Sequence, residues 1–258
     1  MDEVMSGGRF SRPVRRGDVV ERAPSNPNVR GLLRHFERSG FSLAPRFLGT
    51  TAGGTRDRLT FIEGKAAHYP LTEAQRSDEA LVNVVLAVRA MHDASQGFVA
   101  ENPLAWQHRE VAAPVRVDCI GHHDLAPWNM TFNGTEVTGI IDWDFAGPSN
   151  RAWDLSYAAH RFVPLSSSRL AQAFGWSTPP DRATRLRLVA DTYGRGIVPA
   201  ELLDLAVVRL AAVAANIEQQ IRTGNPAFDV HREERHADGY REDVQFLLAH
   251  RDALLRAG

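Results

Sequence analysis

The hydrophobic pattern of this chain of 258 residues changes its period once, near Tyr69-Pro70. Before that point, short apolar runs alternate with turn-forming residues, such as the paired glycines at 7–8 and 53–54, and one stretch, 28–41, has helical spacing. After it, apolar residues recur mainly at intervals of three and four, as in helices that bury one face. The pattern predicts an α+β protein with a small β-rich N-terminal part and a larger, mostly helical C-terminal part.

Capping signals and apolar spacing mark the predicted helices of the second part. Ser77 precedes two acidic residues and an apolar face that ends at His92, which predicts an N-capped helix facing the core. The densest apolar helix is expected at 201–222, and a charged helix at 241–256. The charged segment 231–243 is expected to be an exposed helical face, whose acids could meet a cationic substrate. His92 and His160 stand alone on helical patterns, so we expect ordinary core or surface roles for them.

Charge and cysteine content exclude several classes of partner. The formal net charge is -1, so no whole-protein field would attract nucleic acid or an anionic membrane surface. The single cysteine, Cys119, lies in an apolar run, which predicts an inert buried thiol and fits a reducing compartment. The first ten residues lack an apolar leader segment, and no stretch is apolar enough to span a bilayer. We therefore expect a cytoplasmic monomer or homodimer that binds neither nucleic acid nor membrane.

One hairpin interrupts the helical part of the chain. Residues 129–142 alternate apolar and polar side chains on both sides of Asn133-Gly134, a strong signal for a two-stranded hairpin. A hairpin returns Asp142 to the end where Asn129 departs, beside the preceding loop with His122 and Asp124. The sequence thus predicts that polar side chains from separate positions converge there.

These side-chain types suit a magnesium site next to a proton acceptor. Mg²⁺ prefers oxygen ligands and completes its shell with water and phosphate oxygens, so Asn129 and Asp142 are the predicted ligands. Asp124, on the loop, remains available to accept a proton from a hydroxyl group. A solvated turn is the simpler alternative for Asp124 and Asn129, because Asp, Pro and Asn all favour turns.

Three motifs in order resemble the aminoglycoside phosphotransferase family, relatives of choline kinases and distant relatives of protein kinases. The catalytic motif H-x-D-x-x-x-x-N matches residues 122–129, and the metal motif I-D-[WF] matches 141–143 after the hairpin. A W-D-L-x-Y-A helix start matches 153–158. The resemblance is sharp over residues 119–165, and the order of a β-rich part before a helical part extends it to the whole chain.

The resemblance implies a two-lobed, protein-kinase-like fold and a phosphotransferase. Residues 1–64 would form the nucleotide-binding lobe, with a hinge near 60–64, and residues 65–258 the catalytic and substrate-binding lobe. The enzyme would move the γ-phosphate of ATP or GTP, in the presence of Mg²⁺, to a hydroxyl of an aminoglycoside or another small alcohol.

The resemblance also assigns roles to individual residues. Asp124 would be the catalytic base and His122 would brace its loop, while Asn129 and Asp142 would hold Mg²⁺. The backbone of Phe61, Ile62 and Glu63 would read the nucleotide base. Asp154 would anchor the catalytic loop by accepting backbone N–H bonds.

The chain departs from the family at the phosphate-binding lysine. Its only lysine is Lys65, so the third strand of the N-terminal part carries none. Arg22 is the nearest substitute, with Arg15 and Arg16 as rivals, and Glu37 falls too late in its helix to be an obvious partner. Ser6-Gly7-Gly8 could form a shortened phosphate loop.

Other functions remain as alternatives. A nucleotide-binding pseudokinase would explain the missing lysine. A non-haem iron oxygenase would use His122, Asp124 and His160, and a phosphohydrolase would need His123-Asp124 on a helix, which Pro127 disfavours. Asp144 is open between a substrate contact and a turn cap, and Trp128 and Trp143 are expected to pack.

Overall fold

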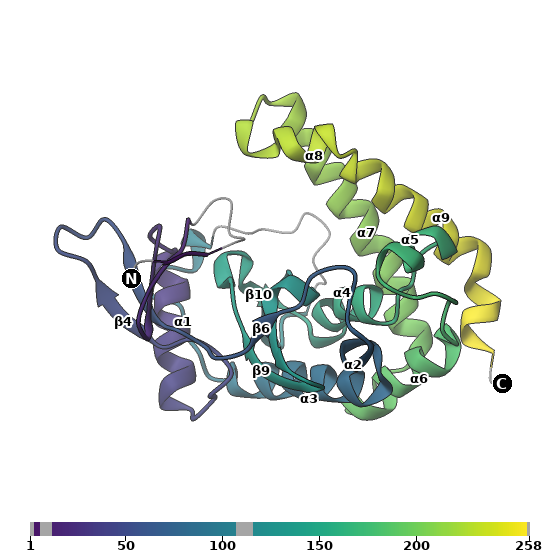
Figure 1. Ribbon diagram of the computed structural model, residues 1–258, viewed down its shortest axis with the longest axis horizontal. Coiled ribbons are helices and arrows are strands. Elements are labelled where there is room, and N and C mark those ends of the chain that lie inside the picture. The colour runs from purple at the N-terminus through teal and green to yellow at the C-terminus, as the bar shows by residue number, and fades with distance from the viewer. Residues whose placement is uncertain (1–2, 6–11, 107–115, 257–258) are drawn as a thin grey trace.

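The N-terminal part of the chain is one antiparallel sheet with a helix against it, as predicted (Figure 1). The computed structural model describes residues 3–5, 12–106 and 116–256. The elements of this part are β1 (Glu3–Val4), β2 (Val14–Arg16), β3 (Val19–Arg22), α1 (Pro27–Arg38), β4 (Phe47–Thr50) and β5 (Asp57–Thr60). The sheet order is β1-β2-β3-β5-β4, and the register places Arg22 opposite Asp57.

Helix α1 follows from its local sequence. Asn26 caps it by accepting a hydrogen bond from the Asn28 amide (2.8 Å), and Pro27 occupies the first helical position, where a missing N–H costs nothing. Its apolar residues fall on one face and are buried. They are Val29, Leu32, Leu33 and Phe36.

The middle of the chain combines one long helix with short strands. Its elements are β6 (Lys65–Ala66), α2 (Glu73–Arg76), α3 (Asp78–Ala94), η1 (Pro103–Ala105), β7 (Cys119–Gly121), η2 (Pro127–Asn129), β8 (Met130–Asn133), β9 (Glu136–Ile140), η3 (Trp143–Phe145) and β10 (Gly147–Ser149). Ser77 caps α3 through the Ala80 amide (3.1 Å), as its position predicts. The hairpin is also confirmed, because β8 pairs with β9 around Gly134, whose φ is +62°. The short strands β6, β7 and β10 were not predicted, since each is too brief to show a period.

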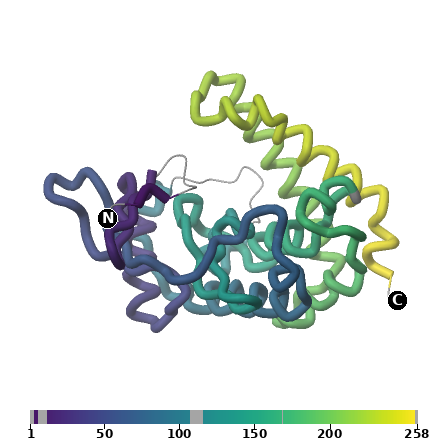
Figure 2. The backbone as a smooth tube through the Cα atoms, in the orientation of Figure 1, coloured from purple at the N-terminus to yellow at the C-terminus, as the bar shows by residue number. Residues whose placement is uncertain are grey.

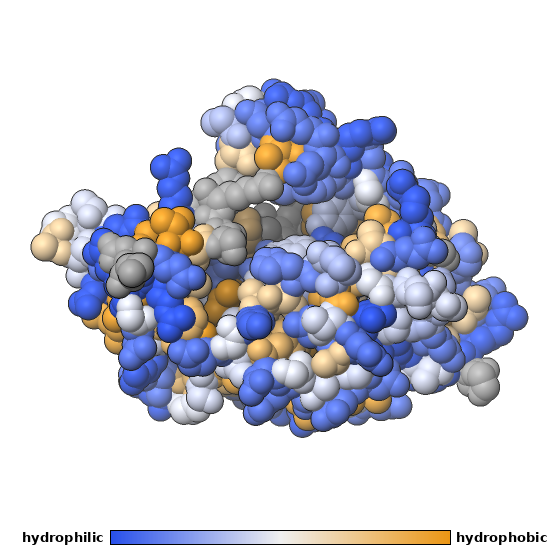
Figure 3. All heavy atoms as spheres, in the orientation of Figure 1, coloured by the Kyte–Doolittle hydropathy of each residue, from blue (hydrophilic) through white to orange (hydrophobic). Residues whose placement is uncertain are grey.

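Helices make up the C-terminal part. They are α4 (Arg151–Phe162), α5 (Ser168–Ala173), α6 (Arg182–Tyr193), α7 (Pro199–Arg222), η4 (Pro226–Phe228), α8 (Asp229–Glu233) and α9 (His236–Leu255). The outer ends of α7 and α9, with η4 and α8 between them, project from the body of the molecule, and we call them the helical arm (Figures 1 and 2). The outer surface of the arm is mostly hydrophilic, and the face in view is hollowed between arm and body (Figure 3). Within the described ranges, no helix combines the length and apolarity needed to cross a membrane.

Segment 231–243 is largely an exposed or half-buried helical surface, as expected, but it is divided between two helices, and Ala237 and Asp243 are buried. The chain breaks between α8 and α9 at Arg235, whose φ is +54°, so α9 runs back along α7, and Asp243 of α9 comes to face α4. Asp243 is consequently buried and accepts a hydrogen bond from His160 (2.8 Å). Other acids of the segment pair with arginines, as Asp238 does with Arg235 (2.8 Å). Reading the segment as one continuous helix concealed this change of face.

The His160–Asp243 pair predicts a pH-dependent stability. Burial lowers the pKa of His160 below its ordinary 6.5, although the bond to Asp243 opposes the shift. The folded state therefore binds fewer protons than the unfolded state as the pH falls below 6.5. We expect the free energy of unfolding to fall on acidification through that value, and His160→Gln to reduce the slope. Urea titrations at several pH values between 8 and 5 measure the free energy of unfolding of the wild-type and His160→Gln proteins. If it depends on pH equally steeply in both proteins, His160 is not responsible.

Candidate active site

Asp154 anchors the loop that carries the predicted catalytic residues. One carboxylate oxygen of Asp154 accepts from the His122 amide and the other from the His123 amide, both at 2.8 Å. Asp154 lies in the first turn of α4 and is fully buried. This is the contact that the resemblance implied for Asp154, and it ties the loop to the helical part of the molecule.

Two further residues complete this anchor: His92, which was expected to have an ordinary core or surface role, and Arg209, which the sequence did not single out. His92 on α3 contacts the Asp154 carboxylate through Nε2 (3.1 Å), and Arg209 on α7 donates to the His123 carbonyl (2.7 Å). Burial alone would raise the pKa of Asp154, but the hydrogen bond with His92 and the nearby His123 and Arg209 bring it well below its usual range. The apolar spacing placed His92 on the core face of α3, but no sequence signal named its partner.

His122 holds the loop through its side chain, whereas His123 stands out by its backbone conformation. His122 is fully buried; its Nε2 donates to the Ile141 carbonyl (2.9 Å), and its Nδ1 accepts from the Asp124 amide (3.3 Å). This pair of bonds corresponds to the neutral tautomer with the proton on Nε2. His123 has a φ of +64°, a conformation that favours glycine or asparagine over histidine. His122 thereby links the loop to the far strand of the hairpin.

Asp124 and Asn129 are brought into direct contact. The Asn129 side-chain nitrogen donates to the Asp124 carboxylate (2.7 Å) and to the Asp124 carbonyl (2.9 Å). Both hydrogens of the Asn129 side-chain amide are therefore used, and the side-chain oxygen Oδ1 is left to face another group. The indole nitrogen of Trp128 lies 3.5 Å from the Asp124 carboxylate, so Trp128 borders the site as well as packing.

Asp142 lies beside Asn129, as the hairpin predicts. The backbone amide of Ile141 donates to the backbone carbonyl of Asn129 (2.9 Å), which joins the two strand ends next to Asp142. Asp142 has a φ of +61°, and its side chain is 37% exposed. A left-handed aspartate turns its carboxylate away from the direction that a strand residue would take. Here the carboxylate faces β3 of the N-terminal sheet, as its partner shows.

That partner is Arg22, the last residue of β3. Its guanidinium, which is 8% exposed, donates to the Asp142 carboxylate (3.3 Å) and forms an ion pair with Asp144. Burial raises the pKa of Asp144, the charge of Asp142 adds to the rise, and Arg22 opposes it. Asp144, which the sequence left open, thus serves as a counterion of Arg22.

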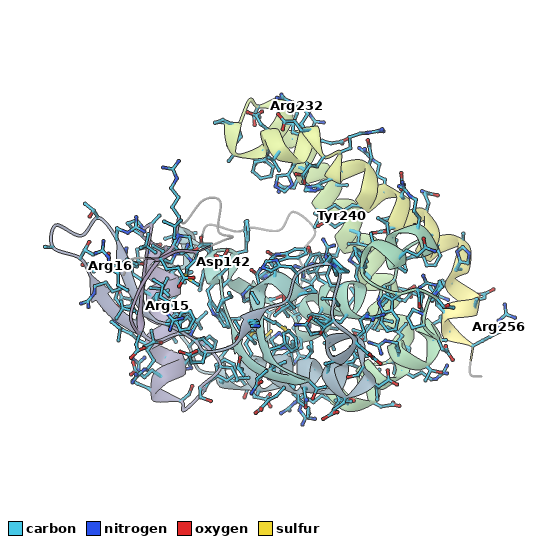
Figure 4. The ribbon with its side chains drawn as sticks, in the orientation of Figure 1. Arg15, Arg16, Asp142, Arg232, Tyr240 and Arg256 are labelled. Atoms are coloured by element: carbon cyan, nitrogen blue, oxygen red, sulfur yellow. The ribbon has the colours of Figure 1, made fainter. Side chains whose placement is uncertain are left out.

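The rival basic residues lie elsewhere. The Arg15 guanidinium stacks over the Phe61 ring at 3.4 Å and pairs with Glu63 (3.3 Å), while Arg16 pairs with Glu21 (3.0 Å). Figure 4 labels Arg15 and Arg16 on the N-terminal sheet and Asp142 beside the space above the body. Among the three arginines, only Arg22 contacts Asp142. The Ser6-Gly7-Gly8 turn lies outside the described residues.

Helix α1 does not supply a glutamate to Arg22. Glu37 pairs with Arg46 (3.7 Å) at the surface. Instead, Arg30 of α1 pairs with the fully buried Asp57 (2.8 Å), which lies opposite Arg22 in the sheet. The ion pair between α1 and the sheet therefore has the reverse polarity of the lysine–glutamate pair expected from the resemblance.

Residues Phe61, Ile62 and Glu63 connect the N-terminal sheet to β6. The Phe61 amide donates to the Asp18 carbonyl (2.8 Å), so this peptide group is already used. Ile62 packs against Gly139 of the hairpin, where an added Cβ would lie 2.5 Å from the isoleucine side chain. The segment thus passes directly over β9.

The donor set around Asp142 fits a hard divalent cation. The side-chain oxygen of Asn129 and the Asp142 carboxylate come from adjoining chain segments, and oxygen is the ligand atom that Mg²⁺ prefers. In the part of the chain that the structure describes, no three His, Cys, Asp or Glu side chains gather to hold a metal by themselves. A magnesium ion here would therefore also need phosphate or water oxygens.

The competing metal sites are not assembled. His160 is bonded to Asp243 and both nitrogens of His122 are used, so the oxygenase set of His122, Asp124 and His160 does not form. His123 and Asp124 lie on a loop, whereas the phosphohydrolase motif requires a helix. Cys119 is buried, and burial raises the pKa of its thiol, as expected for an inert cysteine.

Comparison with known proteins identifies relatives of the whole site. Residues 100–189 match the phosphotransferase enzyme family. The trifolitoxin immunity protein of Rhizobium leguminosarum bv. trifolii is 34% identical over 200 residues, which cover 75% of this chain and 74% of that protein. The homoserine kinase of Rhizobium rhizogenes is 29% identical over 169 residues, and the match spans about half of each chain (50% and 51%).

Solved structures confirm the kinase-like fold. A choline/ethanolamine kinase family protein from Mesorhizobium loti superposes with a TM-score of 0.62 at 18% identity, covering 100% of this chain and 88% of its own. The GDP complex of aminoglycoside 2'-phosphotransferase-IIIa superposes with a TM-score of 0.59 at 13% identity, covering 95% and 92%. With the long match to the immunity protein and the family match around the catalytic loop, these similarities lead to one conclusion: the chain belongs to the phosphotransferase enzyme family and has a two-part, protein-kinase-like fold.

Proposed function

We propose that this protein transfers the γ-phosphate of ATP or GTP to a hydroxyl group of a small molecule. The observation that carries the proposal is the convergence of Asp124, Asn129 and Asp142 at one end of the hairpin, with Arg22 reaching them from the N-terminal sheet. Proton acceptor, metal ligands and phosphate-binding cation are the parts that phosphoryl transfer requires.

Asp124 acts as the base in this mechanism. Its carboxylate accepts the proton of the acceptor hydroxyl as the hydroxyl oxygen attacks the γ-phosphorus. The bond from that phosphorus to the bridging oxygen breaks, and the nucleoside diphosphate leaves. Asn129 fixes the orientation of Asp124 through its hydrogen bond (2.7 Å), and His122 holds the loop through the Ile141 carbonyl.

Asn129 and Asp142 would hold Mg²⁺ through oxygen atoms. The ion supplies positive charge that neutralises the nucleotide phosphates. Arg22 lies against Asp142 and provides a guanidinium where the resemblance led us to expect a lysine. A guanidinium binds phosphate oxygens through two parallel donors, so it replaces the charge of lysine with a different geometry.

The nucleotide base is assigned to the connection between the two parts of the chain. We propose residues 1–64 as the nucleotide-binding lobe, residues 65–258 as the catalytic lobe, and a hinge near residues 60–64. The position of residues 61–63 between β5 of the N-terminal sheet and β6 supports this assignment. The known structures that resemble this fold include GDP and ATP complexes, which supports a nucleotide as phosphoryl donor without choosing the base.

A nucleotide-consumption screen tests the proposal. The purified protein is incubated with ATP or GTP and Mg²⁺ over a panel of aminoglycosides, choline-like alcohols and amino-acid alcohols, and phosphorylated product is identified by mass spectrometry. We expect transfer to at least one acceptor class, loss of transfer when EDTA removes the metal, and recovery when Mg²⁺ is restored. Tight nucleotide binding without transfer to any acceptor would favour a pseudokinase instead.

The role of Arg22 predicts a nucleotide-specific effect. Replacing it with methionine removes the charge and keeps the length, so we expect the KM for nucleotide to rise about 10- to 100-fold, as for the loss of a hydrogen bond to a charged group. Arg22→Lys should recover part of the affinity. Arg46→Met is the matched control, since Arg46 pairs with Glu37 at the surface of the same part of the chain (3.7 Å). An equal rise in both methionine variants would show that the effect is not specific to Arg22.

Immunity to a toxin is a second candidate function at the level of the cell. It is favoured by the 34% identity to a trifolitoxin immunity protein over 75% of this chain. The chemical step would be the same, with the toxin or its target as acceptor. Expression of the wild-type protein and of Asp124→Asn in a trifolitoxin-sensitive strain tests this candidate. Protection by the wild-type protein and not by Asp124→Asn would support immunity through phosphotransfer. If the cells with the wild-type protein are as sensitive to the toxin as the cells with Asp124→Asn, this function is excluded.

A further inference from the structure

A half-buried arginine that pairs with no carboxylate of the described residues lies next to the catalytic loop. Arg161 on α4 is surrounded by Tyr69, Trp128, Tyr157 and Tyr240, and we call these five residues the Arg161 cluster. The Arg161 guanidinium donates to the Tyr157 hydroxyl (2.9 Å) and to the Tyr240 hydroxyl, and it lies 5.0 Å from the centre of the Trp128 ring. The cluster draws on residues from α4, α9, η2 and the connection before α2, so it exists only in the folded chain.

The charge of Arg161 is not neutralised within the described residues. No carboxylate among them forms an ion pair with Arg161, and its Nε is buried without a hydrogen-bond partner. Asp243, on the neighbouring turn of α9, is bonded to His160, and Asp124 is bonded to Asn129. An uncompensated cation in a partly dehydrated site is costly unless an anion completes it.

The tyrosines do not provide that anion. Burial raises the pKa of Tyr69 to about 12, although the charge of Arg161 opposes the shift. Burial likewise raises the pKa of Tyr157. These phenols are neutral at physiological pH, so they supply hydroxyl groups and ring faces to the guanidinium without a balancing charge.

The Arg161 cluster is placed to meet an acceptor substrate. Trp128 contacts both sides: its indole nitrogen lies 3.5 Å from the Asp124 carboxylate, and its ring lies under the Arg161 guanidinium. Arg161, Trp128, Tyr69 and Tyr240 are each partly exposed, which leaves the cluster open to a ligand. Figure 4 shows Tyr240 at the inner side of the helical arm, across the space from Asp142. The cluster thus adjoins Asp124 through Trp128.

We infer that the acceptor is a hydroxy acid, whose hydroxyl meets Asp124 while its carboxylate binds the Arg161 guanidinium. A carboxylate matches one guanidinium in charge and geometry. The Trp128 indole separates the two groups, and its face would pack against a short aliphatic chain. A polycationic acceptor would instead be repelled by Arg161. This inference rests on the proposed function, because it assigns the substrate class of that site.

Matched acceptors and variants test the inference. Phosphotransfer is measured with homoserine and 4-hydroxybutyrate, each beside its amide, and with kanamycin as a polycation. We expect the KM for each acid to be at least about ten-fold below that of its amide, the contribution of a charge-assisted hydrogen bond. Arg161→Gln should abolish this ratio and Arg161→Lys should retain part of it. Arg169→Gln, at an arginine whose side chain is 82% exposed on α5, is the control that should leave the ratio unchanged.

Calorimetry separates this inference from the proposed function. The acids and amides are titrated into Asp124→Asn protein, with and without Arg161→Gln. Arg161-dependent binding of the acids supports the carboxylate site even if no alcohol is phosphorylated. The inference would be overturned, while phosphotransfer stands, if the enzyme phosphorylates the amides or kanamycin at least as well as the acids. It would also be overturned if the preference for the acids survives in Arg161→Gln. Absence of both acid binding and acid preference would overturn it as well. If Arg161→Gln does not fold, the acid-to-amide ratio of the wild-type enzyme and the Arg161→Lys variant decide.

Discussion

Replacing Asp124 with alanine is expected to lower kcat by about 10²- to 10⁴-fold, the usual contribution of a general base. The carboxylate is held by Asn129 and lies beside Trp128, so the substitution removes the proton acceptor and leaves the loop anchored through Asp154. Because Asp124 is half-buried and carries no part of that anchor, the free energy of unfolding should change little. Single-turnover and steady-state rates with the best acceptor of the screen measure the effect.

Two further variants make the Asp124 result specific. Asp124→Asn keeps the size of the side chain and can still accept from Asn129, so a similar loss of rate would assign the effect to the missing base. Asp204→Asn changes an exposed carboxylate that pairs with Arg251 (2.9 Å) and should leave the rate unchanged. A wild-type rate in Asp124→Asn would remove Asp124 from the mechanism.

Replacing Asp154 with alanine is expected to lower the free energy of unfolding by about 3–5 kcal/mol, as when one partner of a buried charged network is removed. The substitution leaves the His122 and His123 amides without these acceptors, and it removes a carboxylate that lies 3.8 Å from the buried Arg209 guanidinium. Urea titration monitored by circular dichroism measures the change. Asp204→Ala is the matched control at an exposed position. An unfolding midpoint equal to that of the control would show that the Asp154 network contributes nothing to stability.

The depressed pKa of Asp154 adds a pH test to this variant. Because the folded state holds the carboxylate ionised well below its ordinary pKa of 3.8, the stability that Asp154 contributes is present above that value and is lost as the pH falls further. The difference in the free energy of unfolding between the wild-type and Asp154→Ala proteins should therefore be constant near neutral pH and become smaller only in strong acid. A difference that shrinks already between pH 7 and pH 5 would assign the loss to another group.

Local sequence patterns determined the framework of the site. The Asn133-Gly134 turn and the alternation around it predicted the hairpin, and the hairpin alone placed Asp142 next to Asn129. The W-D-L-x-Y-A match at 153–158 indicated a helix start at Asp154, and the structure places Asp154 in the first turn of α4, where it meets the loop amides. These features were predictable because each depends on residues within one turn or one hairpin, whose geometry follows from the backbone.

Only the tertiary structure decided which distant groups complete that framework. Arg22 was one of three candidate cations, and the packing of β3 over the hairpin selected it by bringing it to Asp142. Arg161 and Tyr240 meet because α9 runs back along α7 after Arg235, a path that no periodicity revealed. Sequence spacing reports which face of a helix is apolar, but the free energy of packing that face against a particular partner depends on the whole folded chain. The side chains that we propose to bind the acceptor therefore became visible only when the helices were placed in space.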